Sequence, residues 1–264
     1  MDLGLKGTVA IVLAASKGLG RASAAALAAE GANVVIAART RQELEQTARE
    51  IQQTTGSRAL PVPVDVTKAE DLTQLVETTI QEFGRLDILV TNAGGPPFGT
   101  FDNLNDEQWQ AAFELNLLST VRIIRLALPH LRTSGRGRII NIQSMSVKEP
   151  IMGLLLSNSI RPGVAGLAKT LATEIGADHI TINTVCPGRI MTDRILSRPD
   201  IKAKIEQGMS KEEATADQTH DIPVGRIGKP EELGALVTFL ASAQAGYITG
   251  TSIPVDGGLI RSLL

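Results

Sequence analysis

Short apolar runs alternate along the chain with longer stretches whose apolar residues recur at helical spacing. The short runs predict about seven strands, at 8–14, 32–38, 59–64, 86–91, 138–143, 180–185 and 252–255. The longer stretches predict helices at 18–30, 40–54, 68–83, 105–132, 161–177 and 230–242. Nearly continuous apolar strands separated by helices are typical of a parallel sheet covered on both faces. We therefore expect an α/β fold, a Rossmann-type doubly wound sheet in the order 3-2-1-4-5-6-7, with ligands at the carboxyl ends of the strands.

The third predicted strand contains two prolines, Pro61 and Pro63. Proline has no backbone N–H to donate to a neighbouring strand, so such a strand belongs at the edge of a sheet. The expected strand order places the third strand at one edge, and the two predictions agree.

No internal repeat or linker divides the sequence, so we expect residues 1–264 to form a single dinucleotide-binding domain. The long segment 187–229 lacks regular periodicity and is rich in charge, proline and glycine. A connection of this length is usually functional, and we expect a substrate-binding loop or lid.

Composition narrows the possible partners. The formal net charge of −2 and the pI near 6.0 give no basic surface for nucleic acid or an anionic membrane. Cys186 is the only cysteine, and three scattered histidines lack ligand spacing, so we expect neither a disulfide nor a metal site. The first residues show no basic stretch followed by a long apolar run, and a cytoplasmic protein is expected.

A glycine-containing turn follows the first predicted strand and leads directly into a helix. Such a turn lets the backbone approach a phosphate, and the helix N-terminus supplies unpaired N–H groups. A turn of this kind also occurs where only tight packing is needed. The candidate cofactor-binding residues here are Ala14, Ser16, Lys17, Gly18, Leu19 and Gly20.

The end of the second strand indicates which dinucleotide is bound. An NAD site places an acid there for the ribose 2′-hydroxyl, but this chain has Arg39 and no acid before Glu43. Arg39 and Lys17 could together hold a 2′-phosphate, although Arg39 alone could be a solvated residue at a helix start. The two cations favour NADP(H).

Several motifs at strand ends extend this interpretation. They are Asp65-Val66, Thr91-Asn92-Ala93-Gly94, Asn116 within Glu114–Leu117, Asn141-Ile142-Gln143-Ser144, Pro187-Gly188-Arg189-Ile190-Met191-Thr192 and Val255-Asp256-Gly257-Gly258. Because these motifs occur together and in this order, the chain resembles the short-chain dehydrogenase/reductase family, particularly its β-ketoacyl-ACP-reductase-like branch. The resemblance covers essentially the whole length.

The resemblance implies roles for these positions in NADP(H) binding. Asp65 would bond the adenine amino group, Val66 would line the adenine pocket, and Asn92, Ala93 and Gly94 would pass beneath the adenosine ribose. After the sixth strand, the cofactor-binding residues would be Pro187, Gly188, Ile190 and Thr192, with Ile190 and Thr192 at the nicotinamide. Asp65 could instead be a helix cap, and Pro187-Gly188 an ordinary turn.

The sequence departs from the family motif in the phosphate turn. The family motif begins Thr-Gly, and Leu13 and Ala14 occupy those positions here. The Cβ of Ala14 would either displace the pyrophosphate slightly or be accommodated if φ stays negative.

The catalytic positions depart further. Family chemistry uses Asn, Ser, Tyr and Lys, and the candidate catalytic residues here are Asn116, Ser144, Ser157 and Arg161. Ser157 and Arg161 occupy the Tyr and Lys positions in a register set by Gly163–Leu167. An aliphatic hydroxyl has a far higher pKa than a phenol, so Ser157 is a poor general acid. Arg161 keeps its charge and could hold the cofactor ribose or stabilise an alkoxide.

Two neighbouring residues complicate this site. Pro162 disfavours helical geometry before it, which predicts a helix that starts near residue 161 or is kinked there, with 157–160 in a loop or a loosened first turn. Asn158 or Ser159 could then take the direction of the family Tyr. Lys148 is a conceivable replacement acid, although an exposed loop charge is the more ordinary role.

The leading prediction is an NADPH-dependent oxidoreductase that reduces a carbonyl compound, a 3-oxoacyl-like or other hydrophobic ketone. The apolar segments 95–98 and 149–156 would border the substrate. The alternatives are a cofactor-binding pseudoenzyme with a regulatory or assembly role and a recruited non-redox lyase or hydratase. The resemblance also implies a homotetramer in which helices 105–132 and 161–177 pack across a two-fold axis.

Overall fold

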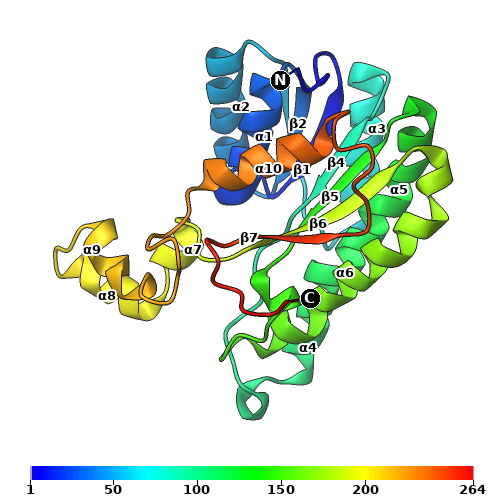
Figure 1. Cartoon of the computed structure of the whole chain (residues 1–264). Helices are drawn as coiled ribbons and strands as arrows, with labels where there is room; N and C mark the ends of the chain where they lie inside the picture. The colour runs from blue at the N-terminus through cyan, green and yellow to red at the C-terminus, as the bar shows by residue number, and fades with distance from the viewer. Residues whose placement is uncertain (1, 264) are drawn as a thin grey trace.

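The computed structural model describes residues 2–263 and contains one seven-stranded parallel sheet (Figure 1). Its strands are β1 (Val9–Leu13), β2 (Asn33–Ala38), β3 (Ala59–Pro63), β4 (Ile88–Thr91), β5 (Arg138–Ile142), β6 (Thr181–Pro187) and β7 (Ser252–Val255). They lie in the order β3-β2-β1-β4-β5-β6-β7 and pair in parallel throughout. The predicted fold class and strand order are confirmed, and the switch of direction between β1 and β4 opens a crevice for ligands.

Helices cover both faces of the sheet. One face is packed by α1 (Gly18–Ala29), α2 (Arg41–Thr55) and α10 (Pro230–Ala241), and the other by α3 (Ala69–Phe83), α5 (Ser119–Ser134) and α6 (Leu155–Glu174). Because side chains alternate along a strand, Ala10 and Val12 of β1 enter the first core and Ile11 and Leu13 the second. No helix among residues 2–263 is long and apolar enough to cross a membrane.

Strand β3 forms one edge of the sheet, as its prolines predict. The Val64 N–H donates to the Ala38 carbonyl at 2.9 Å, and the Val34 N–H donates to the Arg58 carbonyl at 2.9 Å. Even-numbered residues of β3 therefore bond to β2, whereas Pro61 and Pro63 point their backbone nitrogens outward. The prolines thus sit where a donor is not needed.

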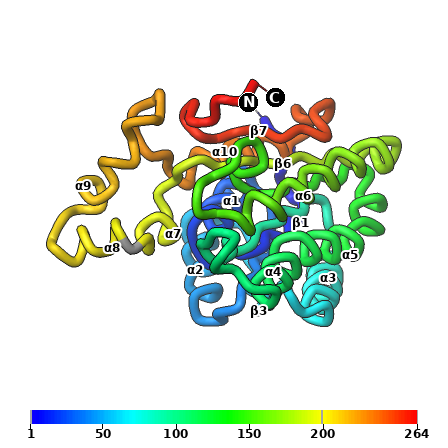
Figure 2. Tube along the Cα trace, turned by 90° about the horizontal axis from the view of Figure 1, so that it is seen from below, coloured from blue at the N-terminus to red at the C-terminus, as the bar shows by residue number. Residues whose placement is uncertain are grey.

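The 187–229 segment is more regular than the sequence predicts. It contains α7 (Asp193–Leu196), α8 (Pro199–Glu206), α9 (Lys211–Thr215) and the 3-10 turn η5 (Ala216–Gln218). Helices α8 and α9 stand away from the sheet (Figures 1 and 2). Ile201 and Ala214 are buried where these two short helices pack together, which explains why they form despite weak periodicity.

The predicted helix at 105–132 is interrupted. Helix α4 (Asp106–Phe113) passes into a π-helical turn, η2 (Glu114–Leu118), and then into α5. Single π turns inside α-helices are frequent at functional sites. The remaining short turns are η1 (Phe101–Asn103), η3 (Met145–Val147) and η4 (Gly176–Asp178).

Helix α6 corrects a prediction based on Pro162. The helix starts at Leu155, so Ser157–Ile160 are helical and not in a loop, and Pro162 lies inside the helix. Burial of Leu156 and Ile160 against α4 and the turn before α5 stabilises this first part of α6. Tertiary packing therefore outweighs the local preference of the residue before proline.

Candidate functional site

The phosphate turn contains an alanine in a left-handed conformation. Ala14 has φ +48°, which excludes the alternative in which φ stays negative: the chain keeps the backbone that favours glycine. The Ala15 N–H donates to the Ala37 carbonyl at 3.1 Å, which ties the turn to β2. This conformation costs an L-residue about 1–2 kcal/mol, and the surrounding bonds hold it in place.

The glycines of the turn are required by geometry. Gly18 has φ +58°, and a Cβ at Gly20 would overlap the carbonyl oxygen of Ala14. Helix α1 therefore approaches the end of β1 closely and presents its first N–H groups to the same space. This cradle fits the pyrophosphate of a dinucleotide.

The two predicted 2′-phosphate ligands are both exposed. The Lys17 ammonium lies 3.7 Å from the Asp193 carboxylate of α7, and both side chains are largely exposed. Arg39 is also exposed, directly after β2, and its charge contributes to a lowered pKa of Asp65. The cations are available to a phosphate because, among residues 2–263, the one ion pair that involves them is weak and solvated.

Asp65 forms a turn before α3 and does not cap that helix, whose N-cap residue is Lys68. Its Oδ1 accepts hydrogen bonds from the Thr67 N–H at 3.0 Å and the Thr67 hydroxyl at 2.8 Å. These two bonds are the main reason that its pKa is lowered. Both use the same oxygen, so Oδ2 remains to accept a bond from an adenine amino group. Val66 packs against the second core.

Asn116 lies in the π turn and reaches the loop after β4. Its Nδ2 donates to the Gly94 carbonyl at 2.8 Å, which joins η2 to the Asn92–Gly94 segment. Its Oδ1 is buried and has no hydrogen-bond partner among the described residues. A buried acceptor without a partner is costly, so this oxygen indicates a place for a donor from a ligand or water.

Three serines form a connected group at the carboxyl end of β5. The Ser144 Oγ accepts a hydrogen bond from the Ser146 N–H at 3.1 Å. The Oγ atoms of Ser146 and Ser157 are 2.9 Å apart, and both residues are buried. Because Ser144 is the acceptor in this bond, it keeps its hydroxyl proton for another partner, whereas the Ser157 Oγ lies against the Ser146 Oγ.

Arg161 is a buried cation one helical turn beyond Ser157. Its Nη1 donates to the Gln143 Oε1 at 3.1 Å, and only 6% of the residue is exposed. Burial, and after it the charge of Arg194, lowers the pKa of Arg161 to about 10. The guanidinium is still cationic at neutral pH, with further N–H donors for a ribose or an oxyanion. Gln143, which sequence reasoning did not single out, holds it in place.

The residues after β6 approach the phosphate turn. A Cβ at Gly188 would lie 2.6 Å from the Asp256 Cβ, so this glycine allows β6 to turn against β7. Ile190 is buried, and Thr192 faces Gly18, with 3.6 Å from its Cγ2 to an ideal Cβ there. The predicted residues on β1, β6 and the start of the 187–229 segment are thus brought together.

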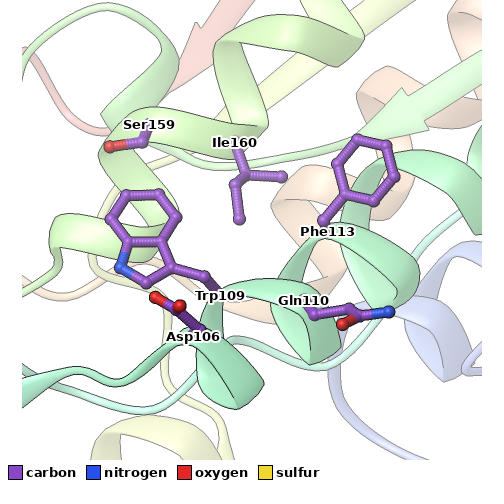
Figure 3. Close-up of a pocket in the computed structure, with 6 residues that line it drawn as sticks. All are labelled: Asp106, Trp109, Gln110, Phe113, Ser159 and Ile160. Carbon is purple, nitrogen blue, oxygen red and sulfur yellow. The ribbon is translucent and has the colours of Figure 1, made fainter.

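Asn158 and Ser159 do not take the place of the family Tyr. The Asn158 side chain bonds both the N–H and the carbonyl of Ile151, at 3.0 and 2.8 Å. Ser159 lies on the outer side of α6 and bonds the Leu155 carbonyl. There it lines a groove of about 620 Å³ with Trp109, Phe113 and Ile160 (Figure 3). This groove between α4 and α6 is separate from the buried Ser157 and Arg161.

Lys148 is half-buried, not an exposed loop charge. It follows η3, which packs against α6 and β6. Burial raises the pKa of Cys186 at the end of β6 to about 11, and the charges of Lys148 and Arg161 oppose that rise. Lys148 therefore lies close enough to the end of β6 to act on the site electrostatically.

Comparison with known proteins identifies the family. The family model described as enoyl-(acyl carrier protein) reductase matches residues 13–260. A protein of Aspergillus oryzae named short chain dehydrogenase/reductase astE is 35% identical over 97% of this chain and 95% of its own. The chain belongs to the short-chain dehydrogenase/reductase family.

Two further members of the short-chain dehydrogenase/reductase family illustrate the similarity. The 3-oxoacyl-[acyl-carrier-protein] reductase FabG of Thermotoga maritima is 31% identical over 97% of this chain and 99% of its own. The solved structure of L-sorbose reductase from Gluconobacter frateurii, complexed with NADPH and L-sorbose, matches with a TM-score of 0.95 at 34% identity. This match covers 100% of the present chain and 100% of the L-sorbose reductase chain. The resemblance read from the motifs is confirmed.

Proposed function

We propose that this short-chain dehydrogenase/reductase is an NADPH-dependent reductase of a carbonyl compound. The observation that carries the proposal is the Ser144 hydroxyl, which accepts a bond from the Ser146 N–H and keeps its own proton for a substrate oxygen. Similarity to ketoacyl reductases and to reductases solved with NADPH supports both the reaction and the cofactor. NADPH would supply the hydride.

The residues of this chain divide the binding of NADP(H) between two ends of the crevice. Lys17 and Arg39 would hold the 2′-phosphate, and the turn from Ala14 to Gly20 would face the pyrophosphate. Asp65 and Val66 would hold the adenine, and Asn92–Gly94 the adenosine ribose. At the other end, Arg161, Ile190 and Thr192 would contact the nicotinamide half, next to Pro187 and Gly188. We also propose that the 187–229 segment is the substrate lid of a single domain.

Catalysis by this chain would proceed without a phenol. Ser144 would donate a hydrogen bond to the carbonyl oxygen and polarise it, and the Arg161 guanidinium would stabilise the developing alkoxide. Asn116 would hold a water through its unpartnered Oδ1, and water would supply the proton. Loss of a positioned general acid costs typically about 10²–10⁴-fold, so we expect a slow but real reductase.

The first test is a calorimetric titration with NADPH and with NADH. Tighter binding of NADPH than of NADH, followed by oxidation of NADPH in the presence of ethyl 2-oxo-4-phenylbutanoate, supports the proposal. Ser144→Ala should abolish turnover without changing the dissociation constant of NADPH. Ser159→Ala, on the outer face of α6, is the matched control. Turnover that survives in Ser144→Ala contradicts the mechanism.

The pseudoenzyme alternative rests on one specific observation. Ser157 is buried, and its Oγ lies 2.9 Å from the Oγ of Ser146 inside the protein. If NADPH binds and no carbonyl compound is reduced, the regulatory or assembly role becomes the better interpretation. We propose a homotetramer in either case, supported by the apolar groove of Trp109, Phe113 and Ile160 on the outside of α4 and α6 (Figure 3).

A further inference from the structure

Three cations lie around the carboxyl ends of β5 and β6 without carboxylate partners. Lys148 follows η3, Arg161 lies in α6 and Arg194 lies in α7. Within residues 2–263, no ion pair involves any of the three. By contrast, the arginines nearby in the 187–229 segment are paired: Arg189 with Asp221 and Arg198 with Asp200.

Arg194 connects α7 to the loop that follows β4. Its Nη2 donates to the Pro96 carbonyl at 2.9 Å, and its guanidinium carbon lies 4.5 Å from the centre of the Phe98 ring. Helix α7 thereby spans from the phosphate turn, where Thr192 faces Gly18, to the loop after β4. The guanidinium is held by one hydrogen bond and one ring contact, which leaves several N–H donors unused.

Arg161 is linked electrostatically to both of the other cations. The charge of Arg194 contributes to the lowered pKa of Arg161, and the charges of Lys148 and Arg161 both act on Cys186, as does the opposite charge of Asp256. Like charges in a partly desolvated space repel one another, and a bound anion relieves that repulsion. Arg161 is buried against Gln143 and suits the cofactor ribose, whereas Arg194 and Lys148 are more accessible to a substrate.

The same opening has an apolar rim. The loops that carry Phe98 and Met152 are joined by a hydrogen bond from the Gly99 N–H to the Gly153 carbonyl at 2.8 Å. Phe98 is 52% exposed and Met152 is 95% exposed. A ligand that contacts both the cations and this apolar rim has an apolar body and a negative charge.

We propose that the substrate is an oxo acid with an apolar body, whose carboxylate is bound by Arg194 and Lys148. The proposal rests on the reductase function above and adds the class of substrate. A planar guanidinium and a flexible ammonium are the two side chains that bind carboxylates best.

Paired substrates test the proposal. The ratio of kcat/KM for 2-oxo-4-phenylbutanoate to that for its ethyl ester is measured with NADPH. In the wild type this ratio should be at least about ten, and Arg194→Met or Lys148→Met should each lower it roughly ten- to hundred-fold. Lys202→Met, an exposed charge on α8, is the control and should leave the ratio unchanged. A wild-type ratio of one, or the same ratio in all variants, overturns the proposal.

Arg194→Met could lower the ratio either by removing the charge of Arg194 or by loosening α7, and a second variant distinguishes the two effects. Phe98→Leu removes the ring contact and keeps the guanidinium, so the acid-to-ester ratio should stay near the wild-type value. If Phe98→Leu lowers the ratio as far as Arg194→Met does, Arg194 acts by holding α7 and the carboxylate site is refuted.

A binding experiment separates this proposal from the reductase function. In calorimetry, 4-phenylbutanoate should bind at least about ten-fold more tightly than 4-phenylbutanamide, and Arg194→Met should abolish the difference. This result supports the carboxylate site even if no carbonyl compound is reduced. Equal affinity for the acid and the amide overturns it whatever the catalytic outcome.

Discussion

The hydroxyl oxygens of Ser146 and Ser157 lie 2.9 Å apart, and both residues are buried in the interior. Because the Ser146 N–H also bonds the Ser144 Oγ, the pair connects the start of α6 to the candidate catalytic serine. In the register predicted from the sequence, the position of the family Tyr is thus occupied by a residue that hydrogen-bonds within the protein interior.

This pair predicts that Ser157→Ala acts mainly on stability. The substitution leaves the buried Ser146 hydroxyl without its partner, so the free energy of unfolding should fall by about 1–3 kcal/mol. Because water supplies the proton in our mechanism, turnover should fall by less than about ten-fold. Urea unfolding and steady-state kinetics measure the two effects, with Ser159→Ala as the exposed control. If turnover instead falls by roughly a hundred-fold or more, Ser157 is the general acid.

The left-handed Ala14 predicts a stabilising substitution. Ala14→Gly removes a conformational cost of about 1–2 kcal/mol and adds about 0.5–1 kcal/mol of unfolded-state entropy. The free energy of unfolding should therefore rise by about 0.5–1 kcal/mol, and the dissociation constant of NADPH should decrease because a Cβ leaves the cradle. Ala15→Gly is the matched control: it has an ordinary φ and should destabilise the protein. If Ala14→Gly instead lowers the free energy of unfolding, the inference that the backbone of Ala14 is strained is wrong.

The burial of Arg161 predicts a change in pH dependence on substitution by lysine. Burial lowers the pKa of Arg161 to about 10, and the same burial would also lower the pKa of a lysine, whose ordinary value is already below that of arginine. In our proposal the charged form holds the ribose, so the NADPH affinity of Arg161→Lys should begin to weaken at a lower pH than that of the wild type. The wild type should hold its affinity until about pH 10. Titrations of NADPH from pH 6 to 9.5 measure this, and parallel profiles for the two proteins would refute it.

The positions of Lys17 and Arg39 predict the cofactor preference. Removing a cation from a 2′-phosphate should weaken NADPH binding roughly ten-fold and leave NADH binding unchanged. Lys17→Ala and Arg39→Ala are measured against Arg41→Ala, an exposed arginine that pairs with Glu45. Equal losses for NADPH and NADH would mean that the two cations do not contact the 2′-phosphate.

The sheet was accessible to sequence reasoning because its signals are local. Apolar runs of strand length identify each strand, and Pro61 and Pro63 identify the edge strand independently of the family resemblance. Ser157 and Arg161 are both buried one turn apart on α6, and their alignment with the family Tyr and Lys stays a prediction.

The features that were not predicted from the sequence depend on contacts between segments that are distant along the chain. The π turn at Glu114–Leu118 adds one residue to a helical turn, which changes apolar spacing too little to detect. The turn at Ala14 is tied to β2 by the bond from the Ala15 N–H to the Ala37 carbonyl, and the start of α6 is stabilised by packing of Leu156 against the α4 side. Gln143 lies in a strand-end motif, and only the position of Arg161 reveals what it binds.

The outward nitrogens of the edge strands limit how copies of this protein associate. In β3 they belong partly to Pro61 and Pro63, and in β7, where the Gly188 N–H bonds the Val255 carbonyl, Pro254 points outward in the same way. Neither rim of the sheet offers an unbroken row of donors to an added strand. The addition of a further strand, and with it growth into fibres, is therefore disfavoured at both edges of the sheet.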